Sequence, residues 1–375
     1  MLVSDAWLAN AGDAAIATAL QKIVLDLAPD AAVLHASYQH DLVGALIPAL
    51  DVIPPLEALL GTPWSSPLAG WEDGLDLLRG ADLVISQGGG FLMEPYQAWK
   101  RLTALADVVR HGRPLCFFGQ TIGRYRAAPA RRLLHASLAG AQLIVVRDPA
   151  SIHNVVDLGA SPDSVHLGTD LAFAHFDPCP APQPARAGIG VVLSEEEMDP
   201  IARQERRALA HRVLAAVIDA ASDEPIIAWS TAQGLGHAGI EDDGRLARDA
   251  IRALPRQNAS RVQLVDGYVT PDEAIGLVSR LQGLVTMRMH PALFAAASGT
   301  PWCLIHAGQK LRVLEDCDLL GRIHPERSLT SEASLRSAVA TALEPVGPAP
   351  AATLAPVIRR LASMRQRLRR LIDAG

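Results

Sequence analysis

The sequence predicts an α/β protein of two domains, each containing a parallel β-sheet covered by helices on both faces. The chain of 375 residues is longer than one ordinary hydrophobic core supports. Short, continuously apolar segments typical of buried strands alternate with helical stretches. This alternation starts again after a proline-rich segment, which indicates a second domain.

The first domain is predicted to span residues 1–176. Helical patterns, such as residues 14–27 and 97–111, separate its apolar segments. Because these segments are apolar throughout, they fit a parallel sheet that is buried on both faces. The expected strands are residues 31–36, 81–86, 114–119, 141–146 and 164–168.

Residues 177–188 contain four prolines and are predicted to be a linker. Proline donates no hydrogen bond to a sheet and stiffens an extended chain. A second domain, residues 189–345, follows; two such domains would enclose a cleft, with ligands beyond the carboxyl ends of the strands. Its expected strands are residues 189–194, 224–230, 261–267, 283–287 and 302–306.

Residues 352–373 are predicted to form a C-terminal helix with six arginines outside its apolar stripe. Such a basic amphipathic helix can lie on an anionic membrane. More often the stripe packs on its own protein, which is the interpretation we favour. The stripe consists of Leu354, Val357, Ile358, Leu361, Met364, Leu368 and Leu371.

Composition excludes several classes of protein. A hydrophobic content of 49% with 20% charged residues indicates a globular chain. The net charge of −6 provides no global basic field for nucleic acid. We expect a cytoplasmic protein, because the sequence has neither a signal-peptide pattern nor an apolar run of about 18 residues. The cysteines lack metal-ligand spacing, and we expect no metal site; they are Cys116, Cys179, Cys303 and Cys317.

The segment TMRMHPALFAAASGTP, residues 286–301, is the strongest candidate for a ligand site. Arg288 and His290 lie between an apolar strand and a small-residue helix. Pro291 suits the first helical position, so the helix is expected to begin immediately after His290. Cations at a helix N-terminus are unfavourable for stability alone, but they fit a bound anion. Lys310, after the next strand, would add a third positive group.

The alternative for this segment is structural: Arg288 pairs with a local carboxylate and His290 caps the helix. Three cations at one strand-end region favour the anion site.

Glycine-rich motifs end two strands of the first domain. SQGGGF contains Gly88, Gly89 and Gly90, which would let backbone N–H groups approach a ligand or would form only a tight turn. Its spacing matches neither a dinucleotide fingerprint nor a P-loop. FGQTIG places Gln120 after the next expected strand.

Charged residues mark further strand and helix ends. Asp13, in NAGDAAI, would cap the following helix or, as the minority interpretation, face the cleft. Arg147, in VVRDPAS, would join the anion site or pair with Asp148, and Asp170 follows a strand in GTDLAF. Most of these motifs would face one cleft, which favours a ligand site there.

Together these motifs resemble the polysaccharide pyruvyl transferase family. The resemblance covers most of residues 1–320 in the family's order, and the R-x-H segment with its later G-x-P is its most specific part. It implies a GT-B-like fold of two Rossmann-like domains, with the acceptor on the first and the donor on the second. The family's pattern is not matched everywhere: the first strand is brief, and Arg124 replaces a common proline.

The resemblance implies transfer of pyruvate from phosphoenolpyruvate onto a sugar hydroxyl pair as a ketal, with release of phosphate. It implies no metal and no cofactor besides phosphoenolpyruvate as co-substrate. Such an enzyme would act in exopolysaccharide or cell-envelope glycan biosynthesis, with peripheral membrane contact where the acceptor is lipid-linked.

The matching residues imply roles at the site. His290 would protonate the donor's methylene carbon, because histidine exchanges protons near neutral pH. Arg288, Lys310 and Arg147 would hold the donor's phosphate and carboxylate. Asp13 or Asp170 would be the base for the sugar hydroxyl. The remaining expected substrate-binding residues are Gly88, Gly89, Gly90 and Gln120.

Two other functions stay open. A GT-B glycosyltransferase would bind a nucleotide-sugar and use a carboxylate such as Asp242 or Asp243 for the ribose hydroxyls, although this stretch fits a solvated helix start equally well. A non-catalytic member of the family would only bind a sugar or a partner protein. The presence of both Arg288 and His290 argues against that last alternative.

Overall fold

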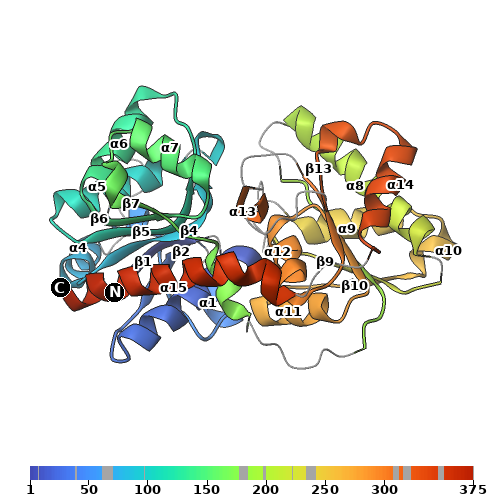
Figure 1. Cartoon of the computed structure of the whole chain (residues 1–375), viewed down its shortest axis with the longest axis horizontal. Coiled ribbons are helices and arrows are strands. Elements are labelled where there is room, and N and C mark those ends of the chain that lie inside the picture. The colour runs from blue at the N-terminus through green and yellow to red at the C-terminus, as the bar shows by residue number, and fades with distance from the viewer. Residues whose placement is uncertain are drawn as a thin grey trace. The chain divides into compact units, whose positions relative to one another are not determined.

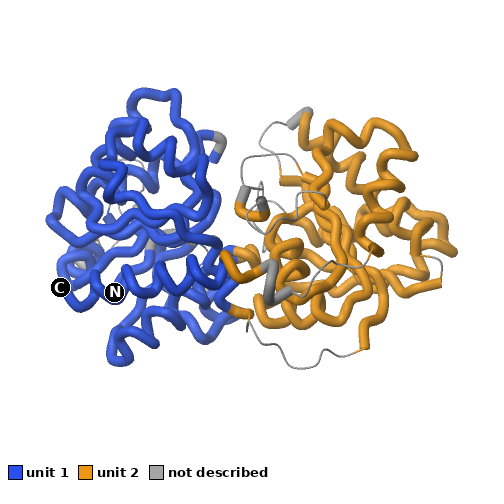
Figure 2. The backbone as a smooth tube through the Cα atoms, viewed as in Figure 1, with its two compact units in different colours: residues 1–8, 13–174, 357–375 blue, residues 9–12, 175–356 orange. Residues whose placement is uncertain are grey.

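The computed structural model describes the chain except residues 7, 39, 61–70, 97, 177–184, 197–199, 222, 234–241, 307–311, 316–321, 345–349 and 375. The chain divides into two compact units (Figures 1 and 2). Unit 1 comprises Met1–Leu8, Asp13–Ala174 and Val357–Gly375, and unit 2 comprises Ala9–Gly12 and His175–Pro356. A short segment near the N-terminus therefore belongs to the second unit, and most of the C-terminal helix to the first. Residues 177–184 of the predicted linker lie outside the described residues.

Unit 1 has a seven-stranded parallel sheet in the order β3-β2-β1-β4-β5-β6-β7. The strand order reverses between β1 and β4, and such a switch point is where open α/β sheets bind ligands. The strands are β1 (Leu2–Ala6), β2 (Leu34–Ser37), β3 (Asp51–Ile53), β4 (Val84–Leu92), β5 (Leu115–Ile122), β6 (Ala141–Val146) and β7 (Val165–Leu167). The helices are α1 (Ala11–Leu27), α2 (His40–Leu46), α3 (Leu56–Leu59), α4 (Trp71–Gly80), α5 (Trp99–Arg110), α6 (Ala128–Ala139) and α7 (Pro149–Asp157), with 3₁₀ turns at Glu94–Tyr96, Pro162–Ser164 and Leu171–His175.

Unit 2 has a six-stranded parallel sheet in the order β10-β9-β8-β11-β12-β13. Its strands are β8 (Ile189–Val192), β9 (Ile226–Trp229), β10 (Val262–Val265), β11 (Gly283–Thr286), β12 (Trp302–Ile305) and β13 (Ile323–His324). Its helices are α8 (Pro200–Ala220), α9 (Asp243–Arg252), α10 (Arg256–Ala259), α11 (Pro271–Ser279), α12 (Met289–Ser298), α13 (Arg312–Glu315) and α14 (Glu332–Thr341), and α15 (Pro350–Ala374) ends the chain.

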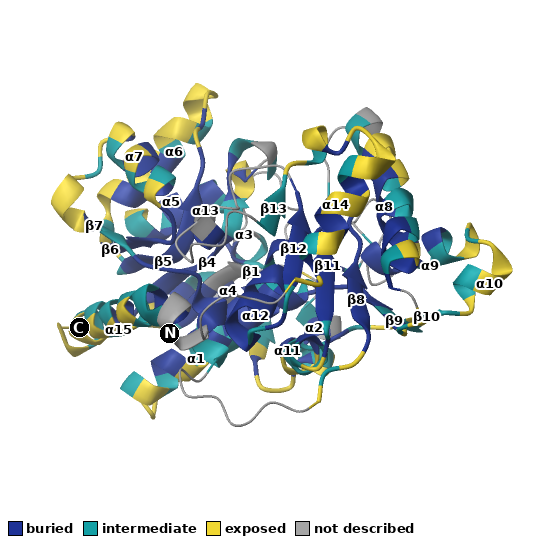
Figure 3. Cartoon of the chain, turned by 45° about the vertical axis from the view of Figure 1, so that its right-hand side comes forward, coloured by how far each residue is buried: buried dark blue, intermediate teal, exposed yellow. Residues whose placement is uncertain are grey.

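The predicted fold class is confirmed, because both sheets are parallel and covered by helices. Each segment expected to be a strand overlaps one, although β2, β4 and β5 extend beyond the expected ends. The expected ranges lack β1, β3 and β13. β1 corresponds to the brief first strand noted with the family resemblance, and β3 and β13 are very short edge strands that are only partly buried. Figure 3 shows buried strands and helices whose exposed faces point outward.

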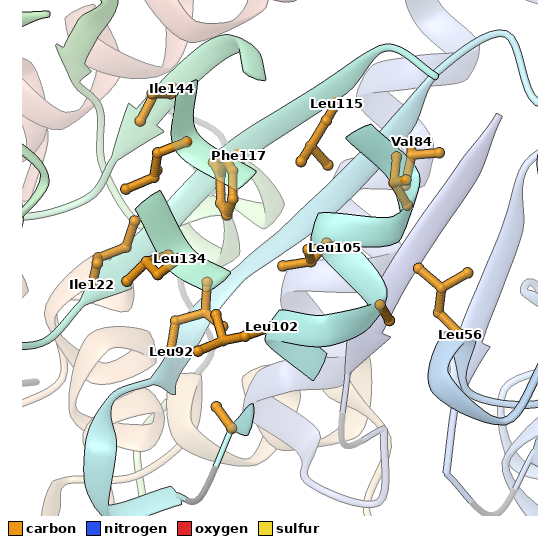
Figure 4. Packing of buried hydrophobic residues seen from close by; sticks show 14 of the residues in the cluster. Leu56, Val84, Leu92, Leu102, Leu105, Leu115, Phe117, Ile122, Leu134 and Ile144 are labelled. Atoms are coloured by element: carbon orange, nitrogen blue, oxygen red, sulfur yellow. The ribbon is translucent and has the colours of Figure 1, made fainter. Parts of the chain in front are cut away.

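The core of unit 1 explains why α5 lies on the sheet. Leu102 and Leu105, three residues apart on one face of this helix, are both fully buried. Figure 4 shows them among side chains of β4, β5 and α6, such as Phe117 and Leu134. Burying a leucine side chain contributes about 1.5–3 kcal/mol, so this face anchors the helix. Unit 2 has a corresponding core of apolar side chains from β8, β9 and α8.

The C-terminal helix α15 packs its apolar stripe on the protein, as predicted. Val357, Met364 and Leu368 are buried. The Met364 thioether accepts a hydrogen bond from the Thr169 backbone N–H at 3.3 Å, which attaches the helix to unit 1. Among the residues that the structure describes, no helix has both the length and the apolar character needed to cross a bilayer.

Candidate functional site in unit 2

Arg288 lies at the junction between β11 and α12. The Thr286 hydroxyl accepts from the Arg288 N–H at 3.0 Å and donates to the Arg288 carbonyl at 2.9 Å. This turn lets α12 begin at Met289, so the expectation that the helix starts after His290 is wrong. Pro291 still fits, because the N–H groups of a first helical turn have no intrahelical acceptor.

Arg288 is only 5% exposed, and its guanidinium donates to two carboxylates. Nε and Nη2 donate to the two oxygens of Asp243 at 2.8 and 2.9 Å, a bidentate pair. Nη1 donates to Glu196 Oε2 at 2.7 Å. Arg288 therefore pairs with carboxylates, as the structural alternative expected, but these are distant in sequence rather than local, and His290 is not the N-cap of α12. The pairs fix the direction of the guanidinium.

Asp243 is the first residue of α9 and is fully buried. Its backbone N–H donates to the Ala232 carbonyl at 3.0 Å. The interpretation of this stretch as a solvated helix start is wrong for Asp243, because its side chain is fully buried. A carboxylate is buried only when it is paired, and here its partner is Arg288. Asp242 is the N-cap of α9 and accepts from the Arg245 N–H at 2.9 Å.

His290 lies in the first turn of α12 and contacts Gly12. A Cβ atom on Gly12 would lie 1.9 Å from the imidazole Nδ1, so any larger residue would require His290 or the backbone to move. The segment around Gly12 pairs with the end of β9: the Ala11 N–H donates to the Thr231 carbonyl at 2.7 Å. Close packing against His290 is therefore the role of glycine at position 12.

Asp13 does not cap α1. The helix begins at Ala11, and the Asn10 side chain accepts from the Gly12 N–H at 2.9 Å. Asparagine is as good an N-cap as aspartate, so the N-A-G-D motif places the cap three residues earlier than expected. Asp13 lies in the first turn of α1, and its backbone carbonyl accepts from Gln87 Nε2 at 3.1 Å.

Arg147 and Asp170 form a buried ion pair inside unit 1, with 1% and 0% of their side chains exposed. Arg147 Nε also donates to the Thr121 hydroxyl at 2.8 Å. Asp148 does not pair with Arg147; it caps α7 by accepting from the Ser151 N–H at 2.9 Å. Arg147 thus pairs with a carboxylate that is distant in sequence, whereas the carboxylate of the adjacent Asp148 caps the N-terminus of α7. A ligand role for Arg147 and Asp170 stays a prediction.

The glycine motif continues β4 rather than forming a turn. Gly89 pairs with Gln120 of β5, and a Cβ on Gly88 would lie 2.8 Å from the Gly119 carbonyl oxygen. Glycine lets these two strands approach, and Gly89 adopts a φ of +143°. Gln120 is buried in β5 and donates to the Ser86 hydroxyl at 3.0 Å.

The structure does not place every expected site residue. Lys310 lies outside the described residues. Glu196 contacts Arg288 in the candidate site but is not among the residues expected from the sequence. Its position just beyond the carboxyl end of β8 could have indicated it, as the end of a strand did for Arg288. Among the described residues, no three His, Cys, Asp or Glu side chains are grouped so as to hold a metal ion.

Comparisons with known proteins agree with this description. The family model "Polysaccharide pyruvyl transferase" matches residues 10–305. No curated protein matches the chain in sequence.

Solved structures share the fold at low sequence identity. A UDP-N-acetylglucosamine 2-epimerase described as putative, from Listeria monocytogenes, has a TM-score of 0.58 and 10% identity, covering 98% of this chain and 96% of that one. Anabaena Alr3699/HepE in complex with UDP and glucose has a TM-score of 0.57 and 12% identity, covering 100% and 99%. The UDP-GlcNAc 2-epimerase from Neisseria meningitidis has a TM-score of 0.53 and 10% identity, covering 96% and 98%. The chain has a GT-B-like fold.

Proposed function

The chain belongs to the polysaccharide pyruvyl transferase family, and from this premise we propose that it transfers pyruvate from phosphoenolpyruvate to a saccharide as a ketal. Family membership makes it a transferase that modifies polysaccharides, with a saccharide acceptor. The donor and the ketal chemistry are the proposal. The observation that carries it is the R-x-H segment, which presents Arg288 and His290 at the N-terminus of α12.

Arg288 suits an anionic donor because its guanidinium is held in one direction. The bidentate pair with buried Asp243 orients the fork, as supporting carboxylates do for ligand-binding cations. Phosphoenolpyruvate carries a carboxylate and a phosphate, and both bind well to arginine and to helix-end N–H groups. We assign Arg288 to one of these anionic groups, with Lys310 and Arg147 as further candidate cations.

His290 would supply the proton of the first step. Protonation of the donor's methylene carbon makes a methyl group and leaves a carbocation-like centre at C2. One sugar hydroxyl attacks C2, the bond between C2 and the phosphate oxygen breaks, and a second hydroxyl closes the ketal. Of the two protons lost by the hydroxyls, one replaces the proton taken from His290 and the other leaves with phosphate.

Asp13 is the better of the two candidate bases. Asp170 is fully buried, and its oxygens accept from Arg147 and from the Ala172 N–H. Asp13 is only partly buried. A carboxylate that accepts a proton from a sugar hydroxyl needs contact with it, which favours Asp13.

The runner-up is a glycosyltransferase with a nucleotide-sugar donor. The Anabaena structures are complexes with UDP or UDP-glucose. Their identity to this chain is 12%, so the likeness concerns the fold. The carboxylate that would hold ribose hydroxyls, Asp243, has both oxygens bonded to Arg288, which favours phosphoenolpyruvate.

Thermal unfolding with phosphoenolpyruvate, UDP-sugars and GDP-sugars tests the proposal. A ligand at about 100 times its Kd adds roughly 2.7 kcal/mol to stability. We expect a shift with phosphoenolpyruvate alone, lost in Arg288→Ala and kept in the control Arg256→Ala, an exposed arginine of α10. Because Arg288→Ala leaves Asp243 buried without this partner, the double variant Arg288→Gln/Asp243→Asn checks that the loss is not misfolding.

A shift with nucleotide-sugars and none with phosphoenolpyruvate would refute the donor assignment. Phosphate release with a saccharide acceptor, absent in His290→Gln, would exclude a non-catalytic member of the family. Binding without turnover for every acceptor tried would favour that member instead.

A further inference from the structure

We propose that Glu196 occupies the place on Arg288 that an anionic ligand takes, so that ligand binding displaces Glu196 from the guanidinium. The inference rests on the proposed function in taking phosphoenolpyruvate as the ligand. Glu196 then acts as a resident competitor that sets the affinity of the site, while Asp243 acts as the permanent partner that orients Arg288.

The two carboxylates on Arg288 are held very differently. Asp243 uses both oxygens, is 0% exposed, and begins α9, where the positive end of the helix dipole favours a carboxylate. Glu196 contributes one oxygen, at 2.7 Å from Nη1, and its side chain is 15% exposed. It follows β8 in a loop rather than starting a helix. Glu196 is therefore the more accessible of the two carboxylates, whereas Asp243 is fully buried and binds Arg288 with both oxygens.

The charges around Arg288 favour such an exchange. Among the residues that the structure describes, the Arg288 guanidinium faces the carboxylates of both Asp243 and Glu196. A donor with a carboxylate and a phosphate would be repelled by a carboxylate that stays on Nη1 of Arg288 in a partly desolvated site. Departure of Glu196 removes this repulsion, and the ligand's anionic oxygen then replaces Oε2 as the acceptor for Nη1. The number of charge-assisted hydrogen bonds is conserved.

The neighbouring residue provides a matched control. Glu195 is also a glutamate of this loop and is buried, but its Oε2 lies 3.2 Å from Arg207 Nε. Glu195→Gln and Glu196→Gln remove the same charge from adjacent positions. Only the second removes the carboxylate from Arg288.

Calorimetric titration of phosphoenolpyruvate into wild type, Glu196→Gln, Glu195→Gln and Asp243→Asn tests the inference. Removing one charged competitor should lower the Kd roughly tenfold in Glu196→Gln, with Glu195→Gln within about twofold of wild type. Asp243→Asn should raise the Kd, because Arg288 loses its orienting partner. If Glu196 had only a structural role, Glu196→Gln would damage the site and weaken binding. Tighter binding in this variant therefore distinguishes a competitor from a structural residue.

The inference is overturned if wild type binds phosphoenolpyruvate and Glu196→Gln binds it no more tightly; the proposed function then stands. If no form binds phosphoenolpyruvate, the proposed function fails, and titration with inorganic phosphate decides the inference. Tighter phosphate binding by Glu196→Gln than by wild type and Glu195→Gln supports displacement. Equal binding overturns it.

Discussion

The imidazole of His290 lies against the backbone of Gly12, where a side chain on residue 12 would need the same space. A Cβ atom there would lie 1.9 Å from Nδ1 and 2.3 Å from Cγ. The two residues belong to the N-A-G-D and R-x-H motifs; they are far apart in the sequence, but both are part of unit 2. Gly12 thereby sets the position of the proposed general acid.

Gly12→Ala should therefore impair catalysis by moving His290. Because a positioned acid contributes about 10²–10⁴-fold, we expect phosphate release to fall roughly 10²-fold or more. Overpacking should also lower the free energy of unfolding by about 1–3 kcal/mol, measured in urea. The control is Gly276→Ala in α11, where an added Cβ meets no atom within 4 Å. Wild-type turnover in Gly12→Ala would show that the position of His290 is unimportant.

Asp170→Asn should act mainly on stability. It breaks a buried ion pair with Arg147, which costs about 3–5 kcal/mol in the free energy of unfolding. Asp76→Asn, in an exposed pair with Arg79, should change it by less than about 1 kcal/mol. Urea unfolding measures both. If Asp170→Asn keeps wild-type stability but loses turnover, the catalytic role predicted from the sequence is correct and the structural role is not.

His35 should make unfolding depend on pH. Burial of its side chain in β2 lowers the pKa of His35 from 6.5 to about 4. Between these values the unfolded chain binds a proton that the folded protein does not, so stability is lost as the pH falls from about 6.5 towards 4. The shift corresponds to about 3 kcal/mol.

Urea unfolding at pH 7 and pH 4.5 checks this prediction for His35. The decrease in the free energy of unfolding should be smaller in His35→Gln by about 2–3 kcal/mol. His111→Gln, which changes an exposed histidine, should keep the wild-type decrease. The same pH dependence in wild type and His35→Gln would contradict the assignment.

Cys116 and Cys303 should resist thiol reagents in the folded protein. Both side chains are buried, and burial raises the pKa of both thiols, that of Cys303 to about 12. The thiolate is the reactive form, so iodoacetamide at pH 8 should leave both unmodified until urea unfolds the chain. Peptide masses report the labelling. Rapid modification of either cysteine before unfolding would show that its burial is transient.

The sequence by itself determined the α/β class and the positions of most strands. A buried strand must be continuously apolar, and this property is local, so β5 and β6 are recognisable without any knowledge of their neighbours. The R-x-H segment is likewise local, since its residues and the helix after it are adjacent in the chain.

Only the tertiary structure decided which partner each charged side chain has. Arg288 pairs with Asp243 and Glu196, and Arg147 with Asp170 rather than with adjacent Asp148. These partners lie at the ends of different strands and helices, so their meeting depends on strand order and register, which no local pattern encodes. The need for glycine at position 12 also follows from tertiary structure. The ring of His290 occupies the space that a side chain at position 12 would need, and only folding brings His290 near.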